Sequence, residues 1–100
     1  MPLSVELQDE HQDPIGKPWW HPRSNESLLE GQPDTCCLRF IDPYGDTTFN
    51  QIQIPVLVAE IEALVQRYVD PEIRSTLQGL LSYVSSARDR PHIYLRFLGD

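Results

Sequence analysis

Two arginines occupy the same short pattern, "LRF", first around Arg39 and again around Arg96 near the end of the printed sequence. A guanidinium group binds carboxylates and phosphates through paired hydrogen bonds, so two arginines on one surface would suit an anionic ligand. Tyr94 and His92 share the strand parity of Arg96 and would lie beside it. Arginine, tyrosine and tryptophan are also enriched at the centres of protein interfaces. These residues therefore indicate either an anion site or a protein-docking surface.

Trp19 and Trp20 are adjacent, so a strand would turn one of them toward the core and the other toward the arginines.

A plainer interpretation of the arginines also follows from the sequence. Each could pair with a nearby acid, such as Glu6, Asp42 or Asp46, across a sheet, where an exposed ion pair adds little stability. The sequence leaves open whether these residues form a binding surface or only decorate a sheet.

Catalytic motifs are missing from the sequence. Three histidines, His11, His21 and His92, are far apart and have no spacing typical of a metal site. Glu60 and Glu62 are two residues apart on an expected helix, so they point in different directions and make a poor acid–base pair. We expect no catalytic residue, no metal site and no cofactor.

Cys36 and Cys37 are neighbours, and disulfide geometry favours Cα atoms about 5.5 Å apart, so a bond between them would be strained. No CxxC or cysteine–histidine spacing supports redox or metal chemistry. We expect a reduced pair with one thiol in the core and the other outside.

Alternating apolar and polar residues predict strands that would position these side chains. The expected strands are residues 3–8, 15–20, 35–41, 47–50 and 92–98. Pro18 lacks an amide hydrogen and so places its strand at a sheet edge or ends it. The turn "DPYGD" would join the third and fourth strands as a hairpin. The core face would carry Cys36, Leu38, Phe40, Leu95 and Phe97, which turns Arg39 and Arg96 to the opposite face.

Between the fourth and fifth strands, apolar residues recur at helical spacing over residues 54–68 and again over residues 73–84. Pro55 fits the first turn of the first helix. Asp70 is expected to cap the second helix, with Pro71 as its first residue. The short junction between the helices predicts that they run antiparallel.

The order is β-β-β-β-α-α-β, which predicts an α+β fold in one domain over residues 1–100. We expect a two-layer sandwich: a mostly antiparallel sheet of about five strands, with an antiparallel helix pair on one face. The loop at residues 21–34 would lie within this domain and not link two domains.

Fifteen acidic against eight basic residues give a net charge of −7, which disfavours nucleic-acid binding and favours a basic protein partner. No apolar run is long enough for a membrane span, and the first residues lack a secretory signal pattern, so a cytoplasmic protein is expected. In size and acidity the chain is similar to small one-domain bacterial proteins that neutralise a toxin.

We therefore predict a non-catalytic protein-binding domain, of the bacterial immunity or inhibitor type, that docks a partner on its open sheet face. The predicted binding residues are Trp19, Trp20, Arg39, His92, Tyr94 and Arg96. One alternative is a small enzyme or a protein that binds an anion or carboxylate through Arg39, Arg96, Tyr94 and His92. Another is a homodimer formed through the open sheet face.

Overall fold

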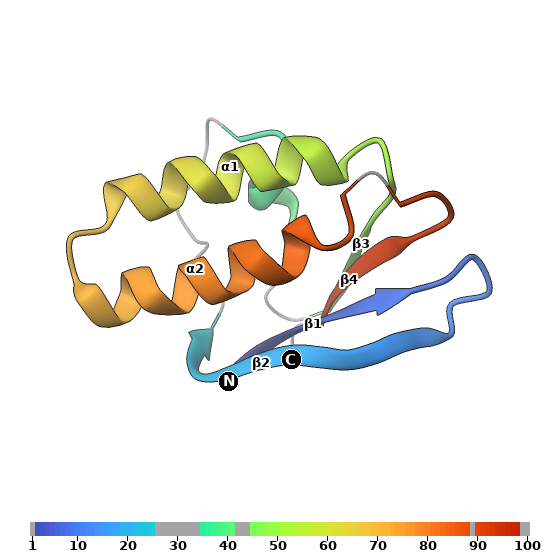
Figure 1. Cartoon of the computed structure of the whole chain (residues 1–100), viewed down its shortest axis with the longest axis horizontal. Coiled ribbons are helices and arrows are strands. Elements are labelled where there is room, and N and C mark those ends of the chain that lie inside the picture. The colour runs from blue at the N-terminus through green and yellow to red at the C-terminus, as the bar shows by residue number, and fades with distance from the viewer. Residues whose placement is uncertain (1, 26–34, 42–44, 89, 99–100) are drawn as a thin grey trace.

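The computed structural model describes residues 2–25, 35–41, 45–88 and 90–98, without the side chains of residues 2, 3, 21–25 and 39. Within these ranges the strands are β1 (Pro2–Gln8), β2 (Pro14–Asn25), β3 (Asp46–Phe49) and β4 (Tyr94–Leu98). The α-helices are α1 (Ile54–Arg67) and α2 (Pro71–Ser85), and Leu38–Phe40 forms a single turn of 3-10 helix. Figure 1 shows the two α-helices side by side and antiparallel, on one side of the sheet. The predicted α+β fold is confirmed.

The sheet has four strands in the order β2-β1-β4-β3, one strand fewer than predicted. All neighbouring strands are antiparallel. Because β2 lies at one edge, Pro18 sits where a missing amide hydrogen is tolerated, as expected. The last strand, β4, inserts between β1 and β3, so residues distant in sequence lie side by side at the centre of the sheet.

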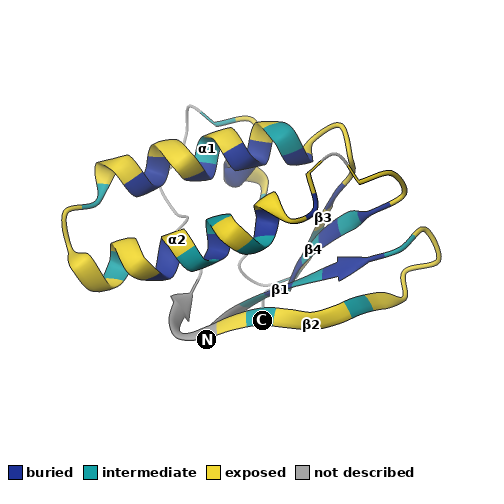
Figure 2. Ribbon diagram, in the orientation of Figure 1, coloured by how far each residue is buried: buried dark blue, intermediate teal, exposed yellow. Residues whose placement is uncertain are grey.

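The helices form where the apolar spacing predicts them. Pro55 occupies the first turn of α1. At the start of α2, the Asp70 carboxylate accepts hydrogen bonds from the amides of Glu72 (2.9 Å) and Ile73 (3.4 Å), which confirms the predicted N-cap. Figure 2 shows that buried residues line the helix sides that face the sheet.

The core lies between the helices and one face of the sheet. Strand residues alternate: Val5, Leu7, Leu95 and Phe97 are buried, while the residues between them are more exposed. The rings of Phe49 and Phe97 meet edge to face with centroids 5.7 Å apart. The helices contribute Ile54, Leu57, Val58, Ile61, Leu64, Val65, Leu77, Leu80 and Val84.

The predicted strand at residues 35–41 is wrong, because Leu38–Phe40 is a 3-10 helix. Cys37 and Leu38 are neighbours and both are buried, which strand alternation does not allow. Cys36 is exposed and Phe40 is 61% exposed. Both were expected in the core, and neither lies there. The expected hairpin is therefore wrong too, since β3 pairs with β4 instead.

The predicted boundaries of β2 are also corrected. Strand β2 continues to Asn25, which pairs with Pro2, so residues 21–25 are strand and not loop. Residues 26–34 of the predicted loop, and residues 42–44 of the predicted turn, lie outside the described residues. Within the described residues, neither helix has the length and apolar run needed to cross a bilayer.

Candidate functional site

The sheet face turned away from the helices carries polar and aromatic side chains, and none of the described elements packs on it. The strand register sets out cross-strand rows on this face, here called the open face. Arg96 of β4 lies opposite Glu6 of β1 and Thr48 of β3. Tyr94 lies opposite Gln8, and Trp20 lies opposite Ser4. The open face is defined by the side chains of Ser4, Glu6, Gln8, Trp20, Asp46, Thr48, Tyr94 and Arg96.

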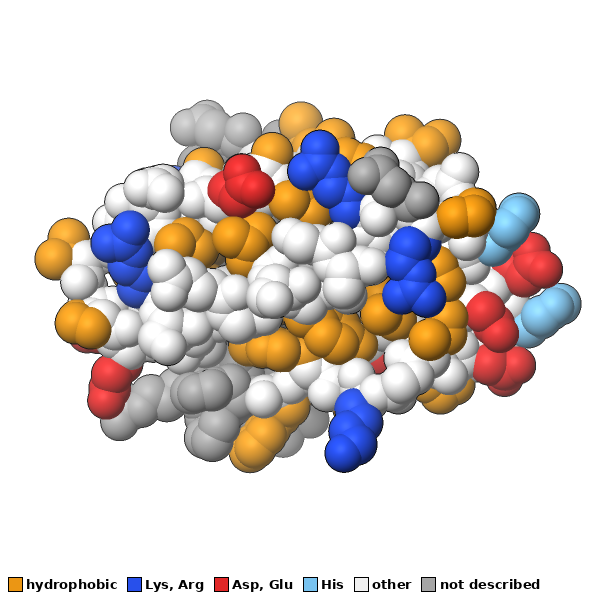
Figure 3. Space-filling model, viewed as in Figure 1, with side chains coloured by type: hydrophobic (Ala, Val, Ile, Leu, Met, Phe, Trp, Pro, Cys, Tyr) orange, Lys and Arg blue, Asp and Glu red, His pale blue; other side chains and the backbone are white. Residues whose placement is uncertain are grey.

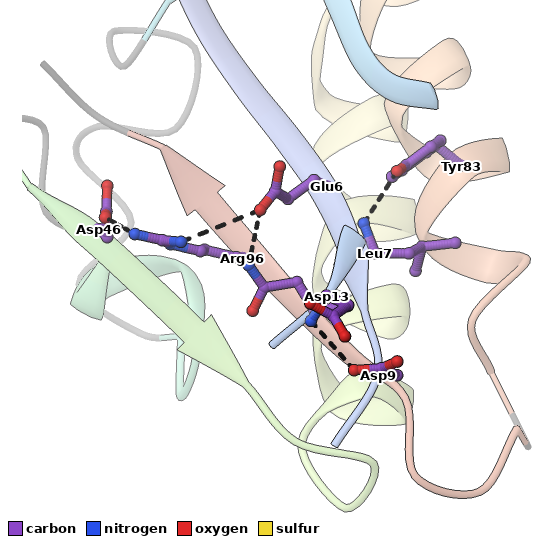
Figure 4. Close-up of polar contacts among 8 residues, drawn as sticks. Glu6, Leu7, Asp9, Asp13, Asp46, Tyr83 and Arg96 are labelled. Carbon is purple, nitrogen blue, oxygen red and sulfur yellow. Dashed lines mark hydrogen bonds and ion pairs between the residues drawn. The ribbon is translucent and has the colours of Figure 1, made fainter. Parts of the chain in front are cut away.

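Arg96 is held between two acids on the open face. Its guanidinium group donates a hydrogen bond to the Asp46 carboxylate, and its Nη1 lies 3.9 Å from Glu6 Oε1. The Gln8 amide donates to the same Glu6 oxygen at 2.6 Å. Figure 4 shows Arg96 between the two carboxylates. The expected pairing with Glu6 and Asp46 is confirmed for Arg96, and it largely neutralises the arginine.

A hollow of about 490 Å³ opens at the end of the open face next to the β1–β2 turn. It is lined by Gln8, Asp9, Glu10, Gln12, Asp46, Thr48, Tyr94 and Arg96. Three carboxylates against one guanidinium give the lining a negative balance. Gln8 is only 3% exposed, so its amide is fixed in place within the sheet.

The β1–β2 turn holds its shape through Asp9. One carboxylate oxygen of Asp9 accepts hydrogen bonds from the amides of His11 (2.8 Å) and Asp13 (3.0 Å). Glu10 projects from the same turn, with its carboxylate 3.3 Å from His92 Nδ1 and 3.7 Å from His11 Nε2. Figure 3 shows acidic and histidine side chains gathered at this end of the molecule.

Three of the six predicted binding residues share the open face, and the other three lie elsewhere. Trp20, Tyr94 and Arg96 lie on the open face, and Trp20 is 55% exposed. His92 lies outside β4, and its side chain contacts the β1–β2 turn, where it meets the Glu10 carboxylate. Trp19 packs against the core, and its indole nitrogen lies 3.4 Å from the point where a Cβ on Gly79 would sit.

Arg39 does not join Arg96 on the sheet. It lies in the 3-10 helix, and its side chain is outside the described residues. Among the residues lining the hollow, Gln8, Asp9, Glu10, Gln12 and Thr48 were not expected from the sequence. The polar alternation of residues 4–8 gave the only signal for Gln8, and nothing in the sequence pairs the turn with Tyr94.

Glu60 has a structural role that the sequence did not reveal, since it was considered there only as one half of a poor acid–base pair with Glu62. Its carboxylate accepts hydrogen bonds from the amides of Cys36 (2.5 Å), Cys37 (3.1 Å) and Leu38 (3.0 Å). These bonds hold the 3-10 helix against α1 and explain why residues 35–41 do not form a strand.

Cys37 is buried and Cys36 is exposed, both as free thiols, so one thiol lies in the core and the other outside as expected, but the buried one is Cys37 and not Cys36. Burial raises the pKa of the Cys37 thiol, and the charges of Glu60 and Cys36 raise it further. A raised pKa lowers the thiolate fraction and opposes a nucleophilic role. Within the described residues, no three histidine, cysteine or acidic side chains are placed to hold a metal ion.

Comparison with models of known protein families, with curated proteins and with solved structures gives no match for this chain. The function is therefore inferred from the geometry of the open face and its hollow.

Proposed function

We propose that this protein is a non-catalytic binding domain that docks a protein partner on its open face. The observation that carries the proposal is Trp20, a large aromatic residue that is 55% exposed on a face bearing Tyr94 and Arg96. Exposed tryptophan is costly in water and contributes strongly when a partner covers it. Trp20 is the expected anchor of the interface.

Charge favours a basic partner. The chain has a net charge of −7, and the lining of the hollow has three carboxylates, Asp9, Glu10 and Asp46, against the one guanidinium group of Arg96. Complementary charge raises the association rate and excludes acidic competitors. A partner that is basic and neutralised by binding would make this an inhibitor-type or immunity-type protein, which is the biological role we propose.

The alternative of an anion or carboxylate ligand is weaker on this geometry. Arg96 already pairs with Asp46 and Glu6, so it has little unneutralised charge to offer. Arg39 lies in the 3-10 helix, outside the sheet that carries Arg96. An anion entering the hollow would also meet Asp9 and Glu10. Repulsion from these carboxylates opposes such a ligand.

The alternative of a homodimer through the open face places two acidic surfaces together. Under a two-fold axis the same acidic patch of both copies enters the interface, so the turn acids Asp9 and Glu10 bring excess negative charge from each copy. Like charges across an interface are unfavourable, so a basic partner suits the face better than a second copy. A mass measurement over a range of protein concentrations separates these two cases.

The experiment is affinity capture with wild type and Trp20→Ala, followed by identification of the captured protein. Val69→Ala is the matched control, because Val69 is an apolar residue that is 91% exposed away from the sheet. We expect one basic protein to be captured by wild type and by Val69→Ala but lost with Trp20→Ala. Equal capture by all three folded proteins would refute docking through this face, as would a concentration-dependent mass with no captured protein.

A further inference from the structure

We propose that the hollow beside the β1–β2 turn receives a cationic side chain, lysine or arginine, from the docked partner. This inference rests on the proposed function and adds the chemistry of one contact. Trp20 pairs with Ser4, whereas the hollow begins at Gln8, four residues farther along β1. At 3.3 Å per residue these points are about 13 Å apart, so the tryptophan and the hollow can be tested separately.

The size of the hollow is suitable for a side chain that enters from a partner. Its volume of about 490 Å³ lies within the range of about 300–1,000 Å³ typical of sites for small molecules, so it has room for a single lysine or arginine side chain. Strand β1 provides its floor at Gln8, and the β1–β2 turn provides one wall at Asp9, Glu10 and Gln12. Because Asp9 fixes the turn through two backbone amides, this wall is formed before a partner binds.

The charge of the lining selects a cation. Arg96 forms an ion pair with Asp46, so these two residues together contribute little net charge to the hollow. Asp9 uses one oxygen for the turn amides, which leaves its second oxygen for a ligand. The Glu10 carboxylate lies 3.3 Å and 3.7 Å from two imidazole groups, and its side chain is still 53% exposed. Two carboxylates are thus available for the hydrogen bonds of an ammonium or guanidinium group.

Neutral groups in the lining suit the same ligand. Tyr94 is among the lining residues, and a cation is attracted to the face of an aromatic ring. Glutamine amide oxygens and the Thr48 hydroxyl are further acceptors in the lining. An arginine or lysine side chain is a pure donor, so each of these acceptors is of a type that can bind it.

The experiment uses the full chain and four small probes, without the unidentified partner. Backbone amide signals are followed by NMR while N-acetylarginine amide, N-acetyllysine amide, N-acetylcitrulline amide or N-acetylglutamate amide is added. We expect the arginine or lysine compound to shift the signals of the hollow residues with millimolar affinity, as suits so small a ligand. Citrulline has nearly the shape of arginine without its charge and is expected to bind about tenfold more weakly.

Two variants connect the binding to the hollow. Glu10→Gln should weaken binding of the cationic probe by about tenfold, the effect of removing one charged hydrogen-bond acceptor. Asp13→Asn is the matched control, since it removes the same charge from the same turn but Asp13 does not line the hollow. Retained binding in the control supports the inference. Equal weakening in both variants would overturn it in favour of general acidic attraction.

Other outcomes also decide the matter. Equal binding of citrulline and arginine, or preferential binding of the glutamate compound, would overturn the inference. So would the absence of any cation-dependent shift. If partner capture were still lost with Trp20→Ala in that case, the docking face would stand and only the cation-binding role of the hollow would fall.

Discussion

The hydroxyl group of Tyr83 on α2 accepts a hydrogen bond from the backbone amide of Leu7 on β1, with 3.0 Å between oxygen and nitrogen. The same hydroxyl donates to the carbonyl of Lys17 on β2 at 3.2 Å. The register of β1 and β2 shifts between Val5 and Leu7, where the ladder of strand hydrogen bonds is irregular. One helix side chain therefore joins the two strands that form one side of the open face, as Figure 4 shows for the bond to Leu7.

Replacing Tyr83 with phenylalanine should lower the free energy of unfolding by about 1–3 kcal/mol. The ring remains, but the Leu7 amide loses its acceptor and the Lys17 carbonyl loses a donor. Chemical denaturation of wild type and Tyr83→Phe measures the difference. Ser82→Ala, at an exposed residue of α2, serves as a control for loss of a hydroxyl group. Equal stability of wild type and Tyr83→Phe would mean that the bridge contributes nothing.

Stability should fall in alkaline solution. Burial raises the pKa of Tyr83 above its ordinary value of 10.0, and burial likewise raises the pKa of Cys37 above 9.0. Between the unfolded and folded pKa values the unfolded chain loses the proton first, so the unfolded state is favoured as pH rises. We expect Tyr83 and Cys37 to make their full contribution to the free energy of unfolding below pH 9.0. Above that pH the free energy of unfolding should decline, and the decline should be shallower in Tyr83→Phe. An unchanged slope in that variant would contradict the role of Tyr83.

Glu60→Ala should destabilise the protein by about 2–3 kcal/mol, since three backbone amides lose a charged acceptor. Glu62→Ala, two residues along the same helix and exposed, should change stability by less than about 0.5 kcal/mol. A thiol-reactive reagent gives a second readout, because release of the 3-10 helix would expose Cys37. Equal reaction rates in Glu60→Ala and wild type would show that Glu60 does not hold the segment.

Leu38→Ala should cost about 2–5 kcal/mol, because Leu38 is 2% exposed and its truncation leaves a cavity. Phe40→Ala is the matched control in the same turn and should cost less than about 1 kcal/mol, given its exposure. Thermal unfolding of the two variants distinguishes them. A larger loss for Phe40→Ala than for Leu38→Ala would mean that the turn packs with its other side inward.

The Arg39→Ala/Arg96→Ala variant should still fold. Arg96 is at the surface, and exposed ion pairs contribute about 1 kcal/mol or less. Circular dichroism and thermal unfolding measure the outcome. Collapse of the variant would instead indicate an ionic network on which the fold depends.

The two copies of "LRF" show how far the sequence could predict the structure. At residues 95–97 the tripeptide is a strand, and its Arg96 faces outward as alternation predicts. At residues 38–40 the same tripeptide is a 3-10 helix, because the Glu60 carboxylate binds the preceding amides. Strand propensity is weak enough for such a tertiary contact to override it.

Periodic segments were predictable, and contacts between distant residues were not. The apolar spacing of residues 54–68 and the Asp70–Pro71 pair identify both helices, because each signal is local. The hollow instead depends on which strands pair. Once β4 lies between β1 and β3, Tyr94 comes beside Gln8, and Arg96 comes beside Glu6 and Thr48. No local pattern contains that register.

The most direct test of docking through the open face is the dissociation constant of the captured partner for wild type, Trp20→Ala and Val69→Ala. The account predicts that Trp20→Ala weakens binding by about 30-fold or more, the effect of losing an anchor worth about 2 kcal/mol. Val69→Ala should bind like wild type. Unchanged binding by folded Trp20→Ala would contradict the account and place the partner on another surface.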